Sequence, residues 1–316
     1  MVKDTALKAR RSGGFVRALG RDIRRNWELY LFSLPGLALI IIFNYLPMYD
    51  GILMSFKNYV PKLGVNGSEW VGLKNYERFF SSYNFWKYLW NTLRLSLYSL
   101  AISWPAPIIL ALMVHELNGK WFKRIFQTVS YAPYFISTVV IVGMMNLMFD
   151  EKGLVNNLIG ILGAQPVNFA LKISNFPHMY VWSGIWQGVG YGAVVYIAAL
   201  SAVDPQQLEA AKIDGATKLQ RIWYIELPCI LPTAVIMLIF AFGSLLGSAF
   251  EKILLMQTPL NLEYSEVIST YVYKVGLLDS KFSFSAAVGM FNSVSNFVLL
   301  TLVNFIARRI SSTSLW

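Results

Sequence analysis

The chain has 316 residues, of which 56% are hydrophobic and only 14% are charged. A typical soluble domain has about 25% charged residues, so the composition excludes an ordinary soluble enzyme and predicts a membrane protein. The formal net charge of +10 fits basic cytoplasmic segments better than nucleic-acid binding. Cys229 is the only cysteine, which excludes an internal disulfide and a Cys-rich metal site.

Six stretches of the sequence are long and apolar enough to cross the hydrocarbon core, which takes about 20 helical residues. They are residues 29–49, 88–114, 125–149, 180–203, 229–250 and 284–307. We predict an all-α polytopic membrane protein with six transmembrane helices. Residues 1–28 are interpreted as a basic cytoplasmic N-terminal segment and residues 29–316 as the transmembrane domain.

Lys and Arg are unevenly distributed between the segments that the six spans separate. With both termini in the cytoplasm, the cytoplasmic segments carry these residues at about twice the density of the opposite segments. The sequence therefore predicts cytoplasmic N- and C-termini and a cytoplasmic segment 204–228. The basic N-terminal segment is expected to form a short surface helix at most.

Polar and aromatic side chains interrupt several of the predicted spans. In the fourth span Gly184, Gly188 and Gly192 recur at four-residue spacing, which predicts a strip where helices pack closely. Seven other side chains are candidates for lining a transport path: Trp182, Trp186, Gln187, Tyr191, Asn292, Asn296 and Asn146. The alternative interpretation is that the asparagines only form hydrogen bonds between helices.

The charged segment between the fourth and fifth spans carries signals for two short helices. Asp204 is an N-cap residue, Pro205 suits the first helical position, and Gln207 completes a capping box. A helix is therefore predicted to begin there and to run to about Ile213. Gly215 can adopt the left-handed conformation that ends a helix.

A second helix is predicted to begin after Thr217, which forms a capping box with Gln220. It is expected to end before Pro228, because proline lacks the backbone donor that continues a helix. Two small alanines beside Glu209 would let the surface of another protein approach the backbone closely. Three cations are expected at the rim of that surface: Lys212, Lys218 and Arg221.

This segment resembles the EAA loop of binding-protein-dependent ABC importer permeases: EAA, then DG after two residues, then LP after eleven more. The matching residues are Glu209, Ala210, Ala211, Asp214, Gly215, Ala216, Leu227, Pro228 and Pro232. The resemblance implies the type I ABC importer permease architecture, in which segment 204–228 is a coupling loop that docks on an ATP-binding subunit. The coupling residues that it implies are Glu209, Ala210, Ala211, Asp214, Gly215, Ala216 and Ile222. Ile222 stands where the family usually has an aromatic residue, so the side chain that fills the partner's groove is left open.

Two further runs, LPGLALIIIFNYLPMY at 34–49 and GLKNYERF at 72–79, resemble permeases of polysaccharide or oligosaccharide uptake. The resemblance implies a second permease subunit in a heterodimer, two ATP-binding subunits, an extracytoplasmic solute-binding protein and a bacterial plasma-membrane location. Aromatic rings and amides in the spans suit carbohydrate, because rings cover C–H faces while amides bind hydroxyls.

The chain itself is interpreted as a non-enzyme that binds no cofactor or metal. It contains no G-x-x-x-x-G-K-[ST] phosphate loop, so ATP and Mg²⁺ would be used by partner subunits. His115 and His178 lie at span ends and no carboxylate lies mid-span, which argues against proton coupling. The alternatives are an ABC permease for a peptide or amino acid, and an ion-driven secondary carrier. The sequence leaves open the identity and length of the sugar. It also leaves open whether the permease forms a homodimer or a heterodimer.

Overall fold

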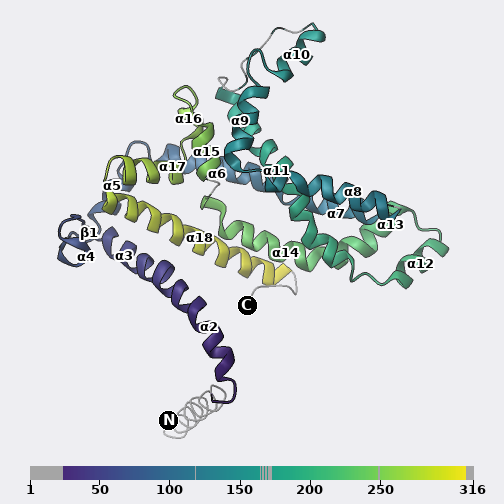
Figure 1. Ribbon diagram of the computed structural model, residues 1–316, viewed down its shortest axis with the longest axis horizontal. Coiled ribbons are helices and arrows are strands. Elements are labelled where there is room, and N and C mark those ends of the chain that lie inside the picture. The colour runs from purple at the N-terminus through teal and green to yellow at the C-terminus, as the bar shows by residue number, and fades with distance from the viewer. Residues whose placement is uncertain are drawn as a thin grey trace. The chain divides into compact units, whose positions relative to one another are not determined.

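The computed structural model describes residues 24–310 except 118, 164, 166, 168, 170–172, 248 and 249. Most of the predicted N-terminal surface helix lies outside the described residues. The chain divides into two compact units, residues 1–72 and residues 73–316. Helices dominate both units (Figure 1), so the predicted all-α class is confirmed.

The first unit is built on one long apolar helix. This helix comprises α2 (Trp27–Ile40), the π-helical turn η1 (Ile41–Tyr45) and α3 (Leu46–Ser55), and together they are long enough to span a membrane. The two-residue strands β1 (Lys57–Asn58) and β2 (Glu69–Trp70) then pair in antiparallel register, with α4 (Gly64–Gly67) between them. Since α2 is apolar on all sides, it is suited to lie in lipid.

The second unit is helical along its described length. Its first half contains α5 (Lys74–Phe80), α6 (Phe85–Ser103), α7 (Pro105–His115), α8 (Lys120–Tyr131), η2 (Ala132–Phe135), α9 (Thr138–Met148), α10 (Leu154–Ile161), η3 (Ile173–Asn175) and α11 (Phe176–Leu200). Its second half contains α12 (Pro205–Ile213), α13 (Lys218–Arg221), η4 (Ile222–Glu226), α14 (Leu227–Gly243), η5 (Leu245–Gly247), α15 (Phe250–Met256), α16 (Leu262–Ser265), α17 (Ile268–Tyr273), η6 (Lys274–Leu278) and α18 (Phe282–Ile310).

Four helices of the described chain are individually long and apolar enough to cross a membrane. They are Trp27–Ser55, Phe85–His115, Lys218–Gly243 and Phe282–Arg309. The number rises to six, as predicted, if each of two bent pairs counts as one span: α8 and η2 with α9, bent by 96°, and η3 and α11 with α12, bent by 81°. In the second pair α11 alone has 25 residues, which is long enough to span, and α12 lies beyond the bend in segment 204–228.

The third predicted span is not the straight helix expected over residues 125–149. Pro133 lies in the tight turn η2, and Ile136 is extended, with φ −80° and ψ 130°. The Ser137 side chain then caps α9 by accepting from the Val140 N–H. The Gln187 side chain of α11 donates to the Ile136 carbonyl oxygen at 3.1 Å. A break within the membrane is tolerated because its backbone groups find protein partners.

The fifth predicted span differs at both ends. The expectation that the second coupling helix ends before Pro228 is wrong, because α13, η4 and α14 form one helix. The Leu227 N–H bonds the Ile222 carbonyl five residues back, and this wide turn relieves the clash that a proline ring makes with the preceding turn. The same arrangement precedes Pro47 in the first unit. The predicted end at Phe250 is also wrong, since α14 stops at Gly243.

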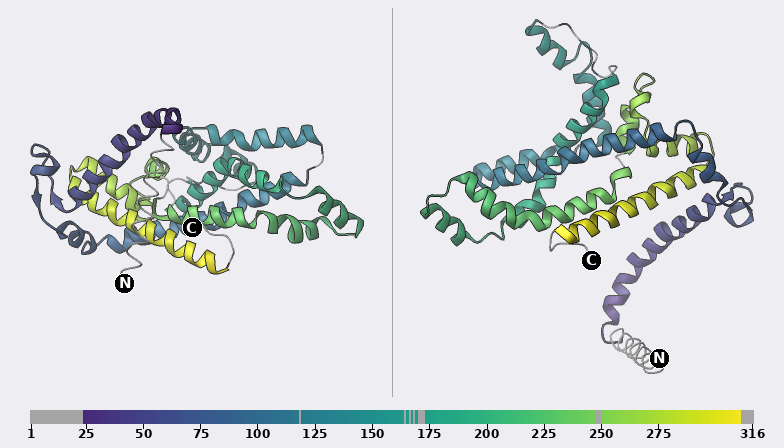
Figure 2. Two further views of the ribbon diagram at one scale, coloured as in Figure 1. Left: turned by 90° about the horizontal axis from the view of Figure 1, so that it is seen from below. Right: turned by 180° about the vertical axis from the view of Figure 1, so that it is seen from behind.

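The core of the second unit forms where α7, α11 and α14 meet. Ala111, Ala193 and Ile230 are fully buried there, and the Trp104 indole N–H donates to the Ala234 carbonyl oxygen at 3.0 Å. Beside this core, α14 and α18 run side by side (Figure 2). These contacts hold the fifth helix against two others, so a movement at its end would be carried into the unit.

The predicted glycine strip of α11 is only partly a packing surface. A Cβ built on Gly192 would lie 3.2 Å from Pro107 of α7, whereas a Cβ on Gly188 would meet nothing within 4 Å. The closest backbone approach is instead at Gly190, where a Cβ would overlap the Ser130 carbonyl of α8. Spacing alone thus located the contact at Gly192 and missed the closer one at Gly190.

Candidate functional site

The loop between α11 and α14 has the two-helix form that its capping residues predict. The Asp204 carboxylate accepts from the Gln206 N–H at 2.9 Å, two residues on, in place of the expected capping box with Gln207. Helix α12 ends at Ile213, and Gly215 is left-handed with φ +79°. In Figure 1 α12 projects at the right-hand end of the second unit.

The second coupling helix begins with the predicted capping box. The Gln220 N–H donates to Thr217 Oγ1 at 3.4 Å, and the Thr217 N–H donates to Gln220 Oε1 at 2.8 Å. Reciprocal bonds of this kind satisfy donors that a helix start leaves free. Both helices are therefore fixed at their starts, and the left-handed glycine sets the angle between them.

The predicted coupling residues divide into an exposed and a half-buried group. Exposed side chains or backbone are found at Glu209, Ala210, Asp214 and Gly215, whereas Ala211, Ala216 and Ile222 are half-buried. Ile222 packs against the core of α7, α11 and α14.

Two apolar side chains that the sequence reasoning missed are strongly exposed on this loop, Ile213 at 87% and Leu219 at 78%. An apolar residue directly before the Asp-Gly turn, on an otherwise polar helix end, was the available signal.

Beneath the loop lies a polar cluster, which we name the loop anchor: His115, Glu116, Arg221 and Glu226. Arg221 and Glu226 are buried, and His115 and Glu116 are half-buried. The expectation that Arg221 is an exposed rim cation is wrong, because only 6% of the residue is exposed. Its Nη2 lies 3.2 Å from Glu116 Oε1 and 3.1 Å from Oε2. Glu226 is fully buried, and its Oε1 lies 3.4 Å from His115 Nδ1.

The loop anchor joins the coupling loop to the end of α7. His115 and Glu116 close α7, while Arg221 and Glu226 belong to the helix that continues into α14. Charges in a low-dielectric interior attract strongly when they are paired and are costly when they are not. The anchor therefore links the coupling loop to α7 and to the helix that continues into α14.

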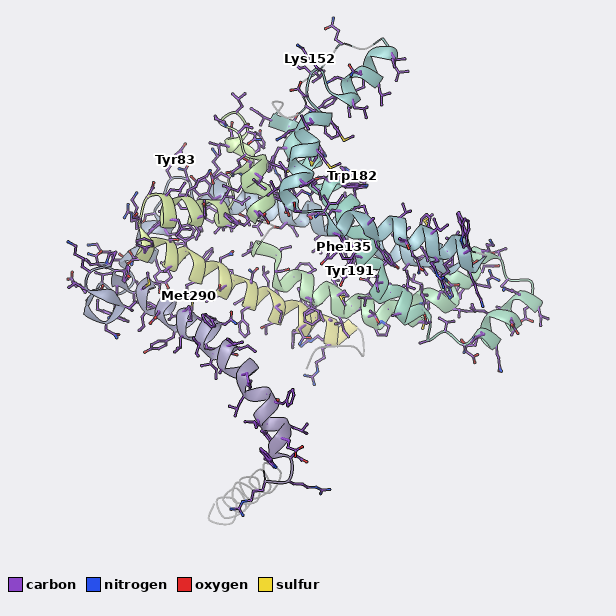
Figure 3. All side chains as sticks on the ribbon, in the orientation of Figure 1. Tyr83, Phe135, Lys152, Trp182, Tyr191 and Met290 are labelled. Carbon is purple, nitrogen blue, oxygen red and sulfur yellow. The ribbon has the colours of Figure 1, made fainter. Side chains whose placement is uncertain are left out.

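Two of the candidate path residues line a cavity of about 460 Å³ between α9 and α11. Trp182 and Trp186 are each about half exposed and share this cavity with Ser183 and several methionines. Tyr191, farther along α11, stacks on Tyr134 with ring centroids 4.0 Å apart and planes 8° from parallel. Figure 3 labels Trp182 and Tyr191 along α11, with Phe135 beside Tyr191. Flat aromatic faces of this kind are suited to the C–H face of a sugar ring.

The amide candidates have other surroundings. Gln187 serves the backbone break at Ile136, as described above, and Asn296 Oδ1 accepts from the Leu246 N–H at 2.9 Å where α14 has ended. Asn146 is exposed on α9. Asn292 Oδ1 is buried with no hydrogen-bond partner in the described part of the chain. Gln187 and Asn296 thus form hydrogen bonds with backbone groups that two helix breaks leave unpaired within their helices. Contact between substrate and any of these amide side chains stays a prediction.

The described residues contain no group of three or more His, Cys, Asp or Glu that could hold a metal ion. The loop anchor contains one ion pair, between Arg221 and Glu116.

Comparison with known proteins gives a consistent result. Residues 103–312 match the family described as "Binding-protein-dependent transport system inner membrane component". The chain is 40% identical over 289 residues to the "Polygalacturonan/rhamnogalacturonan transport system permease protein YteP" of Bacillus subtilis (strain 168), covering 91% of this chain and 90% of that protein.

Two solved structures are similar over nearly the whole chain. One is a bacterial alginate ABC transporter in complex with an alginate pentasaccharide-bound periplasmic protein, with TM-score 0.85 and 36% identity. The other is a bacterial ABC transporter involved in the import of the acidic polysaccharide alginate, with TM-score 0.85 and 37% identity. Each match covers 93% of this chain and 99% of the other.

Proposed function

Because the chain belongs to the binding-protein-dependent transport system inner membrane components, we propose that it is one permease subunit of an ATP-driven importer of oligosaccharides. The observation that carries the proposal is the 36–40% identity, over nine-tenths of the chain, to permeases of polysaccharide transport systems. The chain is an inner-membrane protein, as its family description states.

The proposed partners are a second permease subunit in a heterodimer, two ATP-binding subunits and an extracytoplasmic solute-binding protein. The periplasmic protein in the similar alginate transporter supports the last of these. ATP and Mg²⁺ belong to the ATP-binding subunits, and the permease binds neither. Both termini and the coupling loop 204–228 lie on the cytoplasmic side, where ATP is available.

Coupling is proposed to run through α12 and the helix that begins at Lys218. The exposed Glu209, Ala210, Asp214 and Gly215 would face the ATP-binding subunit, with Ala211, Ala216 and Ile222 supporting them from the half-buried side. Small side chains permit close approach of the partner. The missed apolar pair Ile213 and Leu219 supplies area that is buried on docking.

The proposed mechanism is alternating access. Closure of the ATP-binding subunits displaces the coupling loop, and the loop anchor passes this displacement to α7 and α14. Because α13, η4 and α14 form one continuous helix, a displacement of the coupling loop is transmitted along this helix into the interior of the transmembrane domain. The aromatic cavity at Trp182 and Trp186 is proposed to contact sugar on the path, and Tyr191, Gln187, Asn292, Asn296 and Asn146 stay predictions for the same role.

Reconstitution tests the function directly. The chain would be copurified with the products of neighbouring genes and inserted into liposomes. ATP would be enclosed in the liposome lumen, which represents the cytoplasm, and binding protein and labelled oligosaccharides would be added outside. We expect uptake of at least one oligosaccharide that requires ATP and every subunit, with no uptake of a labelled tripeptide. Transport by this chain alone along an ion gradient would contradict the proposal and favour a secondary carrier.

A further inference from the structure

Lys252 of α15 is a buried cation without a counter-charge among the described residues. Only 4% of the residue is exposed, and its Nζ has no hydrogen-bond partner in that part of the chain. An ammonium in the interior is costly unless something pairs with it. A buried ammonium beside a cavity is therefore a candidate for a functional site.

The surroundings of Lys252 hold the ammonium against α11. Its Nζ lies 5.6 Å from the centre of the Tyr180 ring, and a Cβ built on Gly184 would lie 3.5 Å from it. The aromatic face offsets part of the cost of burial. Burial lowers the pKa of the Lys252 ammonium from 10.5 to about 8, so the group is still mainly charged at neutral pH.

Tyr180 also lines a cavity of about 270 Å³ that is rich in hydroxyl groups. The other polar side chains of its lining are Ser96, Ser99, Ser103 and Ser244. No carboxylate is among the described residues that line it. The Ser244 hydroxyl donates to the Phe240 and Ala241 carbonyl oxygens, and a hydroxyl oxygen can also accept a hydrogen bond. The cavity therefore suits a ligand rich in hydroxyl groups and lacks a group that would repel an anion.

We propose that Lys252 and this serine-lined cavity form a subsite for the carboxylate of a uronate-containing oligosaccharide. Tyr180 connects the two parts, because the centre of its ring lies 5.6 Å from the Lys252 Nζ and the same residue lines the cavity. This ring must turn aside when the carboxylate binds. A carboxylate supplies the counter-charge that Lys252 lacks, and a charge-assisted hydrogen bond is about twice as strong as a neutral one. The inference rests on the proposed import function and specifies the class of substrate.

The names of similar proteins agree with an acidic cargo. YteP is named for polygalacturonan and rhamnogalacturonan, and alginate is described as an acidic polysaccharide. A neutral sugar would supply no counter-charge to the Lys252 ammonium. The buried charge therefore selects acidic oligosaccharides among those that the proposed function allows.

The test uses the complete reconstituted transporter and two probes, trigalacturonate and its neutral methyl ester. Lys252→Met removes the charge and keeps an unbranched side chain that is one atom shorter, Lys252→Arg keeps the charge, and Lys152→Met at an exposed lysine is the matched control. We expect Lys252→Met to lower ATP-driven uptake of trigalacturonate about tenfold relative to the ester. The Lys252→Arg and Lys152→Met variants should stay within about threefold of the wild type.

The outcomes separate this inference from the proposed function. Wild-type uptake of the ester or of neutral maltotriose, without uptake of trigalacturonate, overturns the acidic subsite and leaves oligosaccharide import standing. Equal trigalacturonate uptake by wild type and Lys252→Met overturns the role of Lys252. If Lys252→Met lowers uptake of both probes equally and also lowers the unfolding temperature, Lys252 has a structural role, and the proposed role in binding the carboxylate is overturned. Failure of the wild type to import any oligosaccharide overturns the proposed function itself.

Discussion

Arg221 stabilises the coupling loop from beneath, because its guanidinium pairs with both oxygens of Glu116 while it is almost completely buried. From the sequence, Arg221 was predicted to be an exposed cation, since it follows Lys218 on a polar helix. Its partner lies 105 residues earlier in the chain, and spacing along one helix carries no information about such a pair. Glu226 is similar, since only the packing of α7 shows that it is buried beside His115.

Removing Arg221 should destabilise the permease. Arg221→Met leaves Glu116 and Glu226 without their guanidinium, and loss of one partner of a buried ion pair costs about 3 kcal/mol or more. Thermal unfolding in detergent should show a clearly lower midpoint. Arg221→Lys should recover only part of the loss, because an ammonium is more strongly hydrated than a guanidinium and costs more to bury.

Lys212→Met is the matched control, because it removes an exposed cation from the same loop. Its unfolding midpoint should stay near that of the wild type, since exposed ion pairs contribute little. The double variant Arg221→Met with Glu116→Leu should recover stability. Equal midpoints for Arg221→Met and Lys212→Met would show that the loop anchor is not a stabilising element.

At the scale of elements, hydropathy located the spans and capping residues located the coupling helices. The starts at Asp204 and Thr217 and the stop at Gly215 were predictable because capping is decided within a few residues. The break at Ile136 was not, because the donor that makes it tolerable is Gln187 on another helix. Continuity through Pro228 depends on a π-helical turn that composition does not signal.

The contact of α11 with α8 gives a sharp prediction at this scale. Gly190→Ala places a methyl group into the Ser130 carbonyl, so the helices must separate at a cost of about 1–3 kcal/mol. Gly188→Ala on the same helix meets nothing within 4 Å and should be neutral or slightly stabilising, because alanine is the better helix former. Comparison of the two unfolding midpoints checks this, and equal midpoints would contradict the close contact.

At the scale of the whole molecule, the arrangement across the membrane comes from the distribution of Lys and Arg. The coupling loop and the α10 region are predicted on opposite sides, and Figure 3 labels Lys152 near α10. Cys229 is the only cysteine, so Cys229→Ser supplies a background for labelling single introduced thiols.

Thiol labelling in intact cells tests this topology. On the Cys229→Ser background, Lys152→Cys should react with a membrane-impermeant reagent from outside, and Lys212→Cys should react only after the membrane is opened. The physical reason is that a charged reagent does not cross the hydrocarbon core. Reaction of Lys212→Cys in intact cells would reverse the predicted orientation.

The central claim is that the coupling loop transmits the work of ATP hydrolysis to the spans. The most direct measurement is ATP-driven oligosaccharide uptake by the reconstituted complex carrying Glu209→Lys, beside Gln207→Lys, which adds a cation to the opposite face of the same exposed helix. The account predicts that Glu209→Lys abolishes uptake while its level in the membrane stays normal, and that Gln207→Lys transports. Normal ATP-driven uptake by a correctly inserted Glu209→Lys complex would contradict the account.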